Sequence, residues 1–60
     1  MEIREQAREC IQKCTQNAQE LRDLADRVPN QQVSNMFSHS ADNLEKTIAE
    51  CKSALNQLGE

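Results

Sequence analysis

The 60 residues form one domain at most, spanning residues 1–60, and a chain this short rarely buries enough apolar surface alone. Its net charge of −3 argues against nucleic-acid binding, and it has no apolar run near the ~20 residues that span a membrane. The opening MEIREQ carries two acids and lacks the apolar stretch of an export signal. We therefore expect a cytoplasmic protein whose thiols stay reduced.

A single stretch, VPNQQ, interrupts a composition that is otherwise typical of long helices. Pro29 cannot continue a helix, whereas Asn30 is a good N-cap for the residues that follow. These signals predict helices over about 3–27 and 31–58, with Gly59 as the C-terminal stop. A short loop between two long helices favours an all-α antiparallel hairpin.

Apolar and small residues recur along both predicted helices with steps that alternate between four and three, which is a heptad pattern. When the chain is folded about its loop, each residue of this row faces one whose number brings the sum to 61. We expect the row, named here the sequence seam, to form the hairpin core, where Asn17 either fixes the register or lies at a wet edge. The sequence seam comprises Ile3, Ala7, Cys10, Cys14, Asn17, Leu21, Leu24 and Val28, then Val33, Phe37, Ser40, Leu44, Thr47, Cys51, Ala54 and Leu58.

A second apolar row flanks the sequence seam, and two helices cannot bury both rows. Left exposed, this flanking stripe would mark a partner surface. The simplest partner is a second copy, which predicts a homodimeric four-helix bundle, although another helical protein would cover the stripe equally well. The predicted oligomer interface comprises Ile11, Ala18, Ala25, Ala41, Ile48 and Leu55, with Met36 on the other side of the seam.

Cys10, Cys14 and Cys51 share one end of the predicted hairpin, and three interpretations stay open for them. They can be small buried hydrophobic residues. They can be thiolate ligands for Cu(I), or for Zn(II) with a fourth ligand. Cys10 and Cys51 can also form a disulfide if their backbones approach closely enough.

The sequence shows no catalytic pattern. His39 lacks a base-and-nucleophile context, because the flanking Ser38 and Ser40 would point away from it on a helix. There is neither a Glu-x-x-His pair nor a glycine-rich phosphate loop. We expect no enzyme activity and no cofactor apart from the alternative metal. The predicted function is that of a small, self-associating interaction or structural protein, with thiolate metal binding as the alternative.

The stretch QQVSNMFSHSADNLEKTIAECKSALNQL resembles a family of small uncharacterised helical proteins from spore-forming Firmicutes. The similarity lies in a polar break followed by Met36 and Phe37, then by Ala41 and Leu44. It implies a cytosolic protein linked to sporulation, with no known activity. A second resemblance, through ECIQKC at residues 9–14, is to cysteine-rich four-helix copper-storage proteins, and it implies a test for copper.

Overall fold

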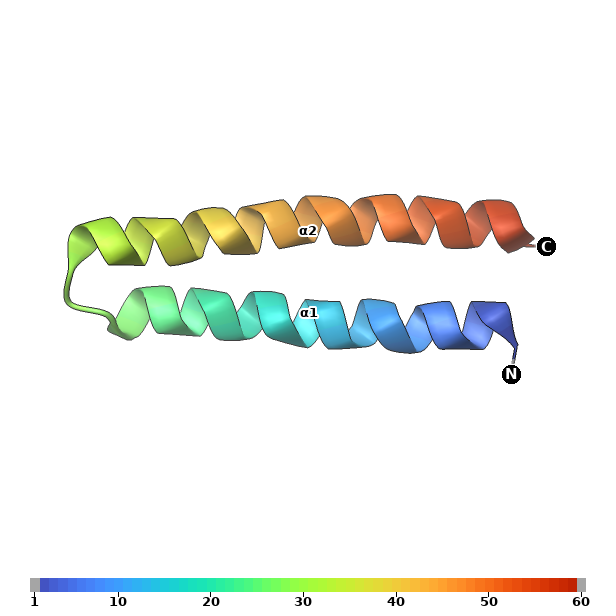
Figure 1. Cartoon of the computed structure of the whole chain (residues 1–60), viewed down its shortest axis with the longest axis horizontal. Helices are drawn as coiled ribbons and strands as arrows, with labels where there is room; N and C mark the ends of the chain where they lie inside the picture. Colours follow the sequence, from blue (N-terminus) through green and yellow to red (C-terminus); the bar gives the residue numbers. More distant parts are fainter. Residues whose placement is uncertain (1, 60) are drawn as a thin grey trace.

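The computed structural model describes residues 2–59 as two helices, α1 (Ile3–Arg27) and α2 (Gln31–Gly59), with no strand in that range. The helices run antiparallel, side by side, and both ends of the chain lie at the end opposite the loop (Figure 1). The predicted all-α hairpin and its break at Pro29 are confirmed. The hairpin is elongated, measuring 45 × 17 × 11 Å.

Side-chain caps satisfy backbone groups at the start of each helix. A carboxylate oxygen of Glu2 accepts a hydrogen bond from the Glu5 N–H at 3.1 Å, and this bond lowers the pKa of Glu2. The amide oxygen of Asn30 accepts one from the Val33 N–H at 3.0 Å, so the predicted N-cap of α2 is confirmed. The other end differs slightly from the prediction, because α2 extends through Gly59 and does not stop before it.

The core between the two helices consists of four residues: Ala18, Ala25, Ala41 and Ile48. This corrects the sequence prediction, which placed all four on the outside as part of an oligomer interface. The prediction is wrong because the flanking stripe is wholly apolar, whereas the sequence seam contains Asn17 among its polar members. Burying the all-apolar stripe avoids the cost of removing unpaired polar groups from water.

The sequence seam consequently lies to one side of the core. Its members divide into two groups according to how much of each residue is exposed to solvent. Six are half-buried at the margin of the core, namely Ala7, Cys14, Leu21, Val28, Phe37 and Leu44. Ten are exposed, namely Ile3, Cys10, Asn17, Leu24, Val33, Ser40, Thr47, Cys51, Ala54 and Leu58.

A hydrogen bond at the loop end joins the helices through a carbonyl that Pro29 would otherwise leave unpaired. In a regular helix the Ala25 carbonyl would accept from the N–H four residues later, but Pro29 has none. The Ser34 hydroxyl of α2 donates to this carbonyl instead, at 2.6 Å, in a partly buried position. The same serine therefore completes the end of α1 and fixes α2 against it.

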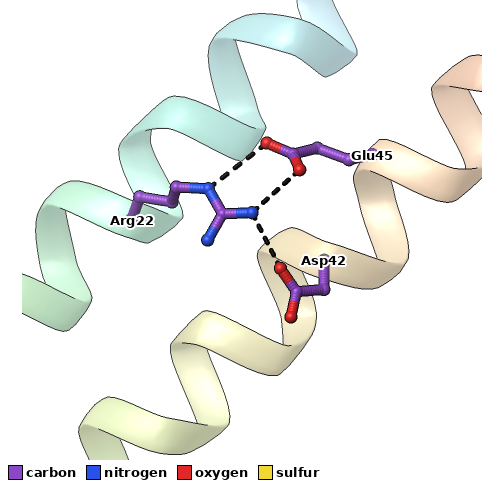
Figure 2. Close-up of polar contacts among 3 residues, drawn as sticks. All are labelled: Arg22, Asp42 and Glu45. Carbon is purple, nitrogen blue, oxygen red and sulfur yellow. Dashed lines mark hydrogen bonds and ion pairs between the residues drawn. The ribbon is translucent and has the colours of Figure 1, made fainter.

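On the side of the hairpin away from the sequence seam, an ion bridge crosses from one helix to the other (Figure 2). The Arg22 guanidinium donates to both carboxylate oxygens of Glu45, at 2.8 and 3.2 Å, and to Asp42 at 2.8 Å. Hydrogen bonds to Glu45 and Asp42 raise the pKa of Arg22, and the bond from Arg22 lowers the pKa of Asp42. This side is thus closed by contacts within the chain.

Ser34→Ala is expected to lower the free energy of unfolding by about 1 kcal/mol, because it leaves the partly buried Ala25 carbonyl without a donor. Urea unfolding followed by circular dichroism measures this loss. Ser53→Ala is the matched control, since Ser53 is exposed on the same helix. Equal losses in the two variants would contradict the role assigned to Ser34.

Arg22→Gln is expected to destabilise the hairpin at neutral pH, and its deficit relative to the parent should shrink in acid. The lowered pKa of Asp42 means that its stabilising contribution is complete above the ordinary value of 3.8. That contribution is lost as the pH falls through the lower folded-state pKa. Urea midpoints between pH 7 and pH 2 measure the trend, with Lys13→Gln as the charge-matched control. A deficit that is constant with pH would argue against the bridge.

Candidate interaction face

One side of the hairpin carries a continuous apolar surface to which both helices contribute. Ala7, Cys10 and Cys14 of α1 line a groove together with residues of α2, and Leu21 and Leu24 line a second groove with Leu44. Eighteen residues make five full helical turns, so Ile3 lies on the same side as Leu21. We name this surface the apolar face. Its members are Ile3, Ala7, Cys10, Cys14, Asn17, Leu21, Leu24, Val33, Phe37, Ser40, Leu44, Thr47, Cys51, Ala54 and Leu58.

None of these members is charged, although charged residues make up 28% of the chain, and Glu20 borders the apolar face where it lines the second groove. Its large side chains are far from covered: Ile3 is 66% exposed, Leu58 56% and Leu24 40%. Even polar Thr47 turns its hydroxyl away, donating to the Asn43 carbonyl of its own helix at 3.1 Å. An exposed apolar surface of this length is a candidate interaction site.

Rotation along the helix separates the apolar face from the ion bridge. Successive residues turn by about 100°, so the step from Leu21 to Arg22 crosses the line of the buried Ala18 and Ala25. Leu21 therefore lies at one margin of the core and Arg22 at the other. The hairpin therefore carries an ion bridge on one side of its core and the apolar face on the other.

All three cysteines line one groove of about 200 Å³ at the open end of the hairpin, beside Ala54 and Leu58. We name it the cysteine groove. The three thiols are free, and the sequence prediction that they share one end of the hairpin is confirmed. Cys10 and Cys51 are exposed, so the interpretation as buried hydrophobic residues is wrong for these two in the single chain, while Cys14 is half-buried.

The surroundings of Cys14 disfavour its thiolate. Loss of solvent raises the pKa of Cys14, and the nearby thiols of Cys10 and Cys51 raise it further. A metal ion would have to displace that proton, because thiolates are the ligands. From residue 2 to residue 59, no group of three or more Cys, His, Asp or Glu side chains is arranged to hold a metal ion.

The other predicted interface residues have different surroundings. Ile11 and Leu55 are half-buried and line the cysteine groove. Met36 is 62% exposed and lies 18 residues before Ala54, at the edge of the apolar face.

The sequence prediction missed Leu24 as a surface residue. The available signal was the polar content of the sequence seam, since a row containing asparagine, serine and threonine is better suited to a wet boundary than to a core.

Within residues 2–59, neither helix is long and apolar enough to cross a membrane. No protein-family model matches the sequence, and no curated protein and no solved structure is detectably similar to it. The two resemblances drawn from the sequence, to the spore-former family and to copper-storage proteins, therefore stay predictions. The strongest structural guide to function is the apolar face itself.

Proposed function

We propose that this chain is a non-catalytic interaction protein of the cytoplasm that self-associates through its apolar face, two hairpins forming a four-helix bundle. The observation that carries the proposal is the exposed surface of uncharged residues along one side of the hairpin, bordered by Glu20. A cytoplasmic location would keep the three thiols reduced. Apart from these thiols, the members of the apolar face include no acid, base or imidazole for chemistry, which favours binding over catalysis.

Surface area supports a partner of similar size. The hairpin exposes 4829 Å² at a mass of 6.8 kDa, whereas a compact protein of that mass exposes about 4,000 Å². The excess of roughly 850 Å² is close to the ~800 Å² that each partner buries in a standard interface. The radius of gyration points the same way, at 14.0 Å against about 10 Å for a compact chain of 60 residues.

The width of the apolar stripe supports a bundle of four helices. In α1, apolar or small residues occupy three positions of the heptad, represented by Leu21, Leu24 and Ala25, and only Arg4 and Asn17 depart from this pattern. A two-helix seam uses two of these positions, whereas helices inside a bundle use a third. A second hairpin placed on the apolar face would give the third position a contact.

Leu24→Glu is expected to raise the dimer dissociation constant by about 100-fold, because it places a charge within the apolar face. Gln19→Glu adds the same charge to an exposed position of α1 outside that face, and should leave the dimer intact. Sedimentation equilibrium of the two variants and the parent measures the difference. A parent that stays a folded monomer at 100 µM would sink the proposal, and so would equal weakening by both variants.

Thiolate metal binding is the second candidate, and the observation in its favour is that all three thiols line the cysteine groove. Native mass spectrometry under anaerobic conditions, with added Cu(I) or Zn(II), tests it. Self-association with the cysteines as packing residues predicts a dimer that takes up no metal. It also predicts that a variant with serine at all three cysteines still dimerises. Discrete uptake that this variant abolishes would favour the metal protein instead.

A further inference from the structure

The apolar face is uneven along its length, and this gives a dimer built on it a direction. Toward the loop it presents large side chains, namely Leu24, Val33 and the half-buried Phe37. Toward the open end, past the exposed pair Ile3 and Leu58, it presents the cysteine groove instead. The following inference rests on the proposed self-association and concerns how the second copy is oriented.

The cysteine groove is large enough to receive a bulky side chain. Its volume is about 200 Å³, and an apolar cavity of 150 Å³ in a protein core holds a benzene molecule. Small side chains create the space, since Ala7 and Ala54 contribute one carbon each beyond the backbone. A groove left open on the inside of an interface would forfeit the contacts of its lining.

A two-fold dimer of two such faces has two simple arrangements, because the interface must be self-complementary. With both loops at the same end, the cysteine groove meets a second cysteine groove, and Leu24 and Phe37 meet their own copies. One end would then be underpacked and the other crowded. With the hairpins reversed, the bulky loop end of each copy meets the groove of the other.

We propose that the two copies lie antiparallel, with the loop end of each covering the cysteine groove of the other. The eight layers of the sequence seam then pair in reverse order. Leu24 and Phe37 of one copy lie over Ala7 and Ala54 of the second copy, and large residues face small ones, as close packing requires. The middle layers, with Asn17, lie at the two-fold axis, where polar side chains keep access to interfacial water.

The antiparallel arrangement determines where the cysteines lie in the dimer. The Cys10 and Cys51 pairs of the two copies lie on opposite sides of the two-fold axis, each facing Leu21 and Ser40 of the other copy. These pairs therefore do not meet, whereas the two Cys14 residues lie in the middle layers, next to the axis. The cysteines act as small apolar residues that line the cysteine groove. Assembly removes the exposed Cys10 and Cys51 from solvent.

Distances between spin labels test the orientation. In a background with alanine at all three cysteines, Gln32→Cys carries a nitroxide at the loop end. The antiparallel dimer predicts a label separation of roughly 40 Å, since the hairpin is 45 Å long. A parallel dimer predicts about 20 Å, because packed helix layers lie 8–10 Å apart and the labels add their own length. Asn43→Cys, near the middle of the hairpin, is the control and gives a short distance in both arrangements.

A short distance from both labels would overturn the antiparallel orientation while leaving self-association in place. No dipolar signal from either label would overturn self-association itself. A second measurement keeps Cys10 and Cys51 and changes only Cys14 to alanine. Under brief oxidation with diamide, the antiparallel dimer of this variant gives no disulfide between Cys10 or Cys51 of different copies, and rapid formation of such a disulfide would overturn the orientation.

Discussion

The structure depends on a mismatch between the width of the apolar stripe on each helix and the width of a contact between two helices. Three positions of the heptad are apolar or small along both helices, apart from Arg4 and Asn17, and one neighbouring helix can cover two of them. The chain settles this by burying the row that contains Ala18, Ala25, Ala41 and Ile48. The remaining row, with its cysteines and its exposed Ile3, Leu24 and Leu58, becomes a surface. The elongated shape, the excess area and the proposed self-association all follow from this choice.

Two polar contacts join the helices outside the apolar face, one at the loop and one on the opposite side of the core. At the loop, Pro29 creates an unpaired carbonyl and Ser34 satisfies it, so the residue that ends α1 also determines where α2 must begin to pack. Along the opposite side, Arg22 reaches two carboxylates of α2. Exposed ion pairs of this kind stabilise a protein only slightly. They join α1 to α2 on the side of the core opposite the apolar face.

The helix ends could be predicted from the sequence because proline and asparagine act locally: Pro29 ends one helix and Asn30 caps the next. The choice between the two apolar rows could not be made from spacing, since residues such as Leu24 and Ala25 are neighbours that repeat with the same period. Composition separates the rows, because Asn17, Ser40 and Thr47 belong to only one of them. The hydrogen bond from Ser34 and the ion bridge from Arg22 depend on how the helices pack, so they could not be predicted from the local sequence. The grouping of the three cysteines followed from counting turns, whereas their exposure depended on which row was buried.

The distribution of side-chain size along the apolar face determines how a second copy is oriented in the proposed dimer. This face carries no charge, so attraction between unlike charges within it cannot choose an orientation for a second copy. A face of uniform side chains would accept both orientations with similar energy and would assemble into a mixture. At the open end, the large pair Ile3 and Leu58 is followed by alanines and cysteines, whereas leucine, valine and phenylalanine follow one another toward the loop. One orientation therefore fills the space beside Ala7 and Ala54, and the other leaves a void there. In the proposed dimer, the small size of Cys10, Cys14 and Cys51 matters as much as their sulfur, because small side chains form the cysteine groove and the groove selects the orientation of the second copy.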